Sequence, residues 1–384
     1  MLPYLPSEIL DLIVDHLYDN PTTLKACALA SKSWIPRTRR HLFAHIEFGS
    51  AGCHIRLWMK AFPDPSNSPA CYTRSLRFSD PSTIAAASTV AIAWVSHFCY
   101  IVELRVDAIS PVPQNPVSLV QLCGLSPTLR FLHLSSLSTA ISEVLGLICS
   151  FPLLEDLRLC FVTTTSDTDG VDTLPTPPRL IGTLSIVAID QTDALTRGLL
   201  SLPGGLHFTR LTVACLTQGS KSVNDLVSRC SDTLKSITIT YNPIGGFTPV
   251  SVADRHSPFA AYRQPPPLIL SSAIRLRNVK FRFLGPSVRW IITTFQTAKT
   301  TSLRQITITI VLYSVSTRAF GETICREWQD LDHLLDELWT SSSVRSKIAF
   351  ETREGNNHHL RKRALILLPR LMSKGAVKLR ADQQ

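Results

Sequence analysis

Apolar residues recur along this chain in a short pattern that returns at nearly constant intervals. The full pattern has an apolar residue, two other residues, a second apolar residue, one further residue and a third apolar residue, and the first and last copies keep only its last two apolar positions. The alternation at its end has a period of two, which predicts a β-strand with one buried face. Ten copies are present, and their central residues are Leu76, Leu104, Leu132, Leu157, Leu184, Leu211, Ile237, Val279, Ile306 and Ile348.

The spacing of these copies predicts how the strands are joined. The first six steps are 25 to 28 residues long, and segments with helical periodicity, such as 138–151 and 192–202, lie between the strands. A strand and a helix at a fixed period predict parallel strands side by side, with the helices on the other face. Two later steps of 42 residues predict insertions at 242–267 and 313–343. A doubly wound α/β enzyme would also alternate strands and helices, but it would not predict ten similar strands at one period.

The period and the strand pattern resemble those of leucine-rich repeats over residues 70 to 352. The resemblance implies an α/β solenoid. That family often places Asn or Cys three residues after the last apolar strand position, where it forms a polar ladder. Here the first six of these positions hold only apolar residues or proline, so we expect an irregular solenoid without that ladder: Pro81, Ile109, Leu137, Val162, Ile189 and Leu216.

The first fifty residues have a different, purely helical pattern. On a helix opened by Pro6, an arc of about 140° holds Ile9, Leu10, Ile13, Val14 and Leu17. Acidic residues occupy the opposite side, and Leu12 lies on their flank. Asn20 and Pro21 predict the start of a second helix, and a third is expected around 38–46. This module is too small to be comfortably stable alone, and its surplus apolar surface suggests docking.

The segments "LPSEILDLIVDHL" and "TTLKACALASKSW" together resemble an F-box, over residues 3 to 48. This resemblance implies that the module docks on the Skp adaptor of a cullin–RING ubiquitin ligase, while the repeats present a protein substrate. Each matching residue could instead be a core contact within the module. The adaptor-facing candidates are Leu5, Pro6, Ile9, Leu10, Ile13, Leu24, Cys27 and Trp34.

The residues between the last two apolar positions of each strand are expected to line the open, concave face of the sheet. The first four are Arg77, Arg105, His133 and Arg158, and hydroxyl residues follow. Nearby acids, among them Glu103, Asp107 and Asp156, could neutralise the arginines locally. The sharper hypothesis is a pocket for an acidic or phosphorylated segment of a partner.

Charge and composition narrow the choice of function. The net charge is +10, and residues 342 to 384 contribute ten Lys or Arg against three acids. No aromatic residues alternate with these cations, so no nucleic-acid partner is expected. No catalytic motif, cofactor motif or metal-ligand spacing stands out. The opening helix carries Glu8 and Asp11, unlike a secretory signal, and the ten cysteines form no C-x-x-C pair, which favours a cytoplasmic or nuclear protein.

Two apolar segments complete the prediction. Residues 81–102 lack charged side chains over the length of a membrane span, but their pattern favours a helix followed by a strand. Residues 326–339 form an amphipathic helix, expected to pack on the repeats or to dock a partner. The domains are therefore an F-box-like module (1–50), a linker (51–72), the repeats (73–352) and a basic helical cap (353–384). We expect a monomeric, non-enzymatic ligase adaptor; a repeat scaffold without a ligase role is the alternative, and an α/β enzyme is the third.

Overall fold

The computed structural model shows an α/β protein whose main strands are all parallel. The chain forms two compact units, Met1–Arg179 and Leu180–Gln384. The structure describes residues 6–49, 55–64, 67–79, 97–107, 119–165, 178, 180–187, 192–202, 204–215, 220–241, 267–284, 287–298, 302–312, 322–342, 344–352, 362 and 364–381. The 242–266 part of the first predicted insertion lies outside these ranges.

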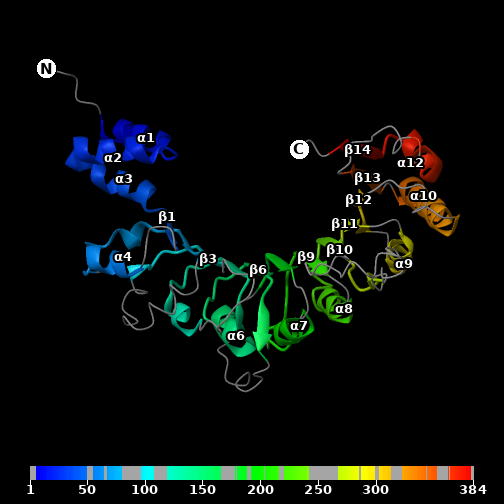
Figure 1. The fold of residues 1–384 in the computed structure, drawn as a ribbon, viewed down its shortest axis with the longest axis horizontal. Helices are drawn as coiled ribbons and strands as arrows, with labels where there is room; N and C mark the ends of the chain where they lie inside the picture. Colours follow the sequence, from blue (N-terminus) through cyan, green and yellow to red (C-terminus); the bar gives the residue numbers. More distant parts are fainter. Residues whose placement is uncertain are drawn as a thin grey trace, which may run out of the picture. The chain divides into compact units, whose positions relative to one another are not determined.

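The first unit begins with helices and continues into a parallel sheet (Figure 1). The strand order in this sheet is β1-β2-β3-β4-β6, and β5 and β7 form a separate two-stranded sheet. Its helices and short 3-10 turns are α1 (Ser7–His16), α2 (Pro21–Ala30), η1 (Lys32–Trp34), α3 (Ile35–Leu42), α4 (Ile55–Ala61), η3 (Pro69–Tyr72), η5 (Val120–Gly124) and α6 (Ile141–Cys149). Its strands are β1 (His45–Phe48), β2 (Ser75–Phe78), β3 (Glu103–Asp107), β4 (Phe131–Ser135), β5 (Ser138–Ala140), β6 (Asp156–Cys160) and β7 (Thr163–Thr165).

The second unit alternates strands and helices, and its strands follow chain order from β8 to β14. Helices α7 to α10 cover one face of its sheet (Figure 1). The strands are β8 (Thr183–Val187), β9 (Arg210–Cys215), β10 (Ser236–Tyr241), β11 (Asn278–Leu284), β12 (Gln305–Leu312), β13 (Arg345–Thr352) and β14 (Val377–Ala381). The helices are α7 (Thr192–Leu200), α8 (Ser220–Arg229), α9 (Arg289–Thr297), α10 (Glu322–Ser342) and α12 (Pro369–Ser373).

All ten predicted central residues are buried in strands, and nine occupy matching register positions within their unit. The tenth prediction is wrong by two residues, because Ile306 faces Ser346 and Ile308 faces Ile348. A shift of two residues keeps the same side chains inward, so the apolar pattern fixes the face of a strand but not its register. Lys347 therefore lies opposite Thr307.

Within the predicted linker at 51–72, the described residues 55–64 and 67–72 contain the helix α4 and the turn η3 and belong to the fold. The predicted third helix ends at Leu42, and β1 pairs with β2 from His45 onward. In α4, Trp58 is buried against aromatic rings, with centroid distances of 6.0 Å to Phe43, 5.9 Å to Phe48 and 4.9 Å to Phe62. These contacts close the end of the first apolar core, which the strand pattern alone could not reveal.

Hydroxyl groups link successive repeats. A Ser or Thr shortly before a strand donates to a backbone carbonyl about one repeat earlier: Thr128 to Ile101 at 2.9 Å, Thr233 to Phe208 at 3.1 Å and Ser302 to Leu276 at 2.9 Å. Each of these bonds joins a carbonyl of one repeat to a side chain of the next. They link successive repeats from a position before the strand, whereas the Asn or Cys ladder of leucine-rich repeats lies after it.

The predicted helix at 326–339 lies within α10 and packs on its own unit. Trp328, Leu331 and Leu335 are fully buried, and Trp328 stacks near Phe350 with a centroid distance of 5.6 Å. This agrees with packing on the repeats, the first of the two expectations for this helix.

The C-terminal cap is partly helical. Among the leucine and isoleucine side chains of this cap, Leu367, Leu368 and Leu371 are buried, whereas Leu365 and Ile366 are exposed. The chain then ends its described part in a strand, β14, which was not predicted. Within the described ranges, no helix combines the length and apolar character needed to cross a bilayer. Most of the 81–102 segment, residues 81–96, lies outside those ranges.

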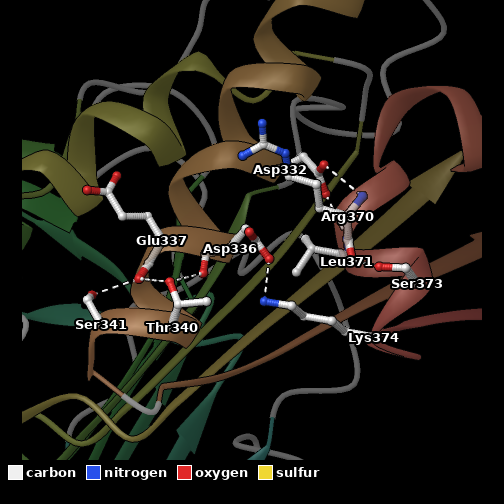
Figure 2. A network of polar contacts seen from close by, with 9 residues as sticks. All are labelled: Asp332, Asp336, Glu337, Thr340, Ser341, Arg370, Leu371, Ser373 and Lys374. Carbon is white, nitrogen blue, oxygen red and sulfur yellow. Dashed lines mark hydrogen bonds and ion pairs between the residues drawn. The ribbon is translucent and has the colours of Figure 1, made fainter.

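Figure 2 shows how α10 holds this cap. Asp332 is 2% exposed, and its carboxylate oxygens accept hydrogen bonds from the backbone N–H groups of Arg370 and Leu371, each at 3.0 Å. One turn further on, Asp336 pairs with Lys374 at 2.5 Å. Asp332 therefore caps the first turn of α12.

Candidate functional site

Helix α1 exposes apolar residues on one side. Ile9, Leu12 and Ile13 are 43%, 54% and 46% exposed, whereas Val14 is 1% exposed. Residues three and four apart are neighbours on a helix surface, so these three side chains form one continuous surface. We call Ile9, Leu12 and Ile13 the α1 patch. Pro6, immediately before the helix, is also exposed.

An ion-pair cluster determines which side of α1 faces inward. The Asp15 carboxylate accepts from Arg37 Nε at 2.6 Å, pairs with Arg37 Nη2, and contacts His41 Nε2 at 2.7 Å. The hydrogen bonds from Arg37 hold the pKa of Asp15 well below its usual range, although partial burial opposes this. Because Asp15 turns toward α3, the packed side of α1 includes acidic positions, and Leu12 is rotated outward beside Ile9.

The structure sorts the predicted adaptor-facing residues into three groups. Pro6, Ile9 and Ile13 are exposed. Leu24 is 1% exposed and belongs to the core of the module. It lies in α2, whose first turn is capped by the Asn20 side chain, which accepts a 3.0 Å hydrogen bond from the Thr23 N–H. Leu5 lies outside the described residues, and the half-buried candidates are Leu10, Cys27 and Trp34. Helical periodicity does not select Leu12, because the most apolar arc of α1 differs from the side that packs on α3.

The predicted row on the sheet of the first unit is brought together. Arg77, Arg105, His133 and Arg158 occupy opposing positions on β2, β3, β4 and β6. The pKa of His133 is lowered, mainly by burial, which favours the neutral imidazole. The face on which these residues lie is therefore shared by three arginines and a largely neutral histidine.

Acidic neighbours neutralise two of these arginines. Arg77 Nε lies 2.8 Å from Asp107, and Arg77 Nη1 lies 3.6 Å from Glu47 on β1. Arg105 Nη2 lies 2.6 Å from Glu103. The expected pairing of Glu103 with Arg105 is present, whereas Asp107 pairs across the strands with Arg77. Arg158 is exposed and makes no ion pair within the part of the chain that the structure describes. The face thus carries mixed charge.

A second basic surface lies in the other unit and was not predicted. A cavity of about 1060 Å³ lies beside the residues that precede β11 and β12. Its cationic lining residues are Lys235, Arg275, Arg277, Arg304, Arg345 and Lys347. The repeat segments carry a signal for it, because Lys235, Arg277 and Arg304 each follow a leucine and stand two residues before the central apolar residue.

Reactive groups are scarce in the described regions. Burial raises the pKa of the Cys149 and Cys230 thiols to about 11, so both are protonated at neutral pH. Among the described residues, no three His, Cys, Asp or Glu side chains gather in a way that could hold a metal ion. No protein-family model matches the sequence, and a search among curated proteins finds no significant match.

Proposed function

We propose that this chain is an interaction adaptor: the helical module docks on the Skp adaptor of a cullin–RING ligase, and the repeats bind a protein to be ubiquitinated. The observation that carries the proposal is the α1 patch, three large apolar side chains about half exposed on a small module. A contiguous apolar surface of this kind is typical of protein–protein contacts. The strand–helix repeat that follows the module offers an extended surface for a second protein.

The patch is large enough to contribute substantially to docking. Full burial of a Leu or Ile side chain is worth about 1.5–3 kcal/mol, and roughly half of each side chain in the patch remains to be buried. Covering all three would therefore contribute about 2–4 kcal/mol. A carboxylate placed in the same contact would lose this contribution and add the cost of desolvating a charge.

Binding of the full chain to the purified Skp adaptor, measured by biolayer interferometry, tests the proposal. Leu12→Asp and Ile13→Asp are expected to weaken binding by about a hundredfold or more. Leu29→Asp is the matched control, since Leu29 on α2 is 90% exposed and lies outside the patch. Substitution of Leu12 is the most informative test of the patch, because the apolar arc predicted from the sequence does not include this residue.

Two outcomes would overturn the proposal. Absence of binding by the folded wild-type chain would favour a repeat scaffold without a ligase role. Binding that Leu12→Asp and Ile13→Asp leave unchanged would show that the adaptor contacts another part of the chain. Circular dichroism of each variant separates these outcomes from loss of folding.

A further inference from the structure

The cavity in the second unit has an unusually one-sided charge. Six of its lining residues are cationic and none is acidic. The remainder are polar or apolar, and none is aromatic: Ile274, Asn278, Ser302, Leu303, Gln305 and Ser342. A protein surface normally mixes both signs of charge, as the face around Arg77 does, so a cavity of one sign calls for a ligand of the other sign.

The repeat itself aligns these cations. The Arg277 N–H donates to the Lys235 carbonyl at 2.9 Å, the Arg304 N–H to the Arg277 carbonyl at 2.8 Å, and the Arg345 N–H to the Arg304 carbonyl at 2.9 Å. Each bond joins one parallel strand to the next, a step of about 4.8 Å. The four residues therefore follow one line across β10, β11, β12 and β13, roughly 14 Å long.

No carboxylate neutralises this line within the described ranges. None of the six cations takes part in an ion pair there, although other cations of the same unit do: Arg282 pairs with Glu351, and Lys374 with Asp336. All six are exposed at the cavity. Like charges held at this spacing repel one another, and an anion that lies between them relieves the repulsion.

We propose that this cavity binds a segment of a protein partner that carries two or more phosphate groups. Arginine forms bidentate, charge-assisted hydrogen bonds with phosphate oxygens, and Asn278, Ser302 and Gln305 add neutral donors. Cations in a line fit groups spaced along an extended peptide. A single-stranded nucleic acid would call for aromatic side chains on which bases stack, and the lining has none.

This inference rests on the proposed function, since the phosphorylated segment would belong to the protein that the repeats recognise. It also places the anion-binding site in the cavity of the second unit, and not at the row from Arg77 to Arg158 that the sequence suggested. Arg77 and Arg105 are already paired with acids, whereas Arg277 and Arg304 have no acidic partner among the described residues. The acidic partner therefore meets the second unit, at the edge where β10 to β13 begin.

Fluorescence anisotropy with the full chain tests this site. The probe is a labelled ten-residue peptide with two phosphoserines separated by one residue, and its unphosphorylated form is the first control. The variant Arg277→Glu/Arg304→Glu is expected to bind the phosphopeptide at least about tenfold more weakly, and binding should weaken as salt rises. Arg326→Glu is the matched control, because Arg326 is exposed on α10 and does not line the cavity.

The inference would be overturned by equal affinity for both peptides, by an unchanged affinity of the double variant, or by tighter binding of a single-stranded oligonucleotide of equal charge. Pyrophosphate as a competitor separates the peptide from a free phosphate compound; tighter binding of pyrophosphate than of the phosphopeptide would also contradict a peptide ligand. Leu12→Asp should leave phosphopeptide binding intact, so failure at this cavity is distinguishable from failure at the α1 patch. Thermal melts confirm that each variant is folded.

Discussion

Replacing Asp332 by alanine should loosen the C-terminal end of the second unit. Its carboxylate is almost fully buried and accepts two backbone hydrogen bonds at the first turn of α12, both at 3.0 Å (Figure 2). Alanine removes both acceptors and leaves two N–H groups without partners in a place that water reaches poorly. Asparagine keeps one acceptor oxygen and nearly the same shape.

The expected cost of Asp332→Ala follows from these contacts. Loss of a helix cap costs about 0.5–2 kcal/mol, and a hydrogen bond to a charged group contributes about 1.5–3 kcal/mol. Because the two bonds share one carboxylate whose burial is itself unfavourable, we expect a total of about 2–4 kcal/mol. For a unit of this size, that corresponds to a fall in Tm of roughly 5–15 °C. Asp332→Asn should lose about half as much.

Hydrogen exchange followed by mass spectrometry is the most direct measurement. Asp332→Ala should speed exchange in residues 364–381 and leave residues 131–160 of the first unit unchanged. Asp330→Ala is the matched control, since Asp330 is exposed on the same helix. If Asp332→Ala and Asp330→Ala had equal exchange and equal Tm, the cap would contribute nothing to stability and the reasoning would be refuted.

Two further predictions concern polar groups in each unit. Since the pKa of Asp15 is lowered in the folded chain by its bonds to Arg37, its contribution is complete above the unfolded-state pKa near 4 and declines as pH falls. Asp15→Asn should therefore weaken protection of residues 7–42 from hydrogen exchange at pH 7 more than at pH 3; an equal effect at both pH values would contradict the pairing. Ser346 is 1% exposed, and its hydroxyl has no partner among the described residues. Ser346→Ala should raise the free energy of unfolding by up to about 1 kcal/mol in a urea titration, and a loss above 1 kcal/mol would show a hidden hydrogen bond.

Much of the fold was predictable because each strand can be recognised from the alternation of apolar residues within its own segment. The alternation around Leu104 or Ile237 identifies a buried face without knowledge of any neighbour, and the constant step predicts parallel pairing. Register at the last predicted strand was not predictable, because moving Ile348 by two residues keeps it inward. The packing of Trp58 was equally unpredictable, since one of its partners, Phe98, belongs to a segment far along the chain.

The candidate surfaces were predictable only in part. Ile9 and Ile13 follow from helical periodicity, but the exposure of Leu12 depends on the pairing of Asp15 with Arg37, a contact across 22 residues. The row from Arg77 to Arg158 was predicted in position, whereas the pairing of Arg77 with Asp107 needed the register. The basic cavity could have been found by aligning the residue two places before each central apolar position.

The connection between α3 and β1 is short, and both of its residues make contacts within the first unit. Only Phe43 and Ala44 separate Leu42 from His45. The Ala44 carbonyl accepts hydrogen bonds from Arg74 at 2.8 Å and Ser75 at 3.0 Å, and the Phe43 ring packs on Trp58. Both residues of this join therefore contact segments beyond β1, which opposes bending between α3 and the sheet. A partner bound to the α1 patch would be linked to the strands of the first unit through this short packed join, without a long linker between them. Deletion of residues 1–48 would also remove β1 and expose the edge of β2. Point substitutions on α1 are therefore the better way to separate the function of the helical module from that of the strands.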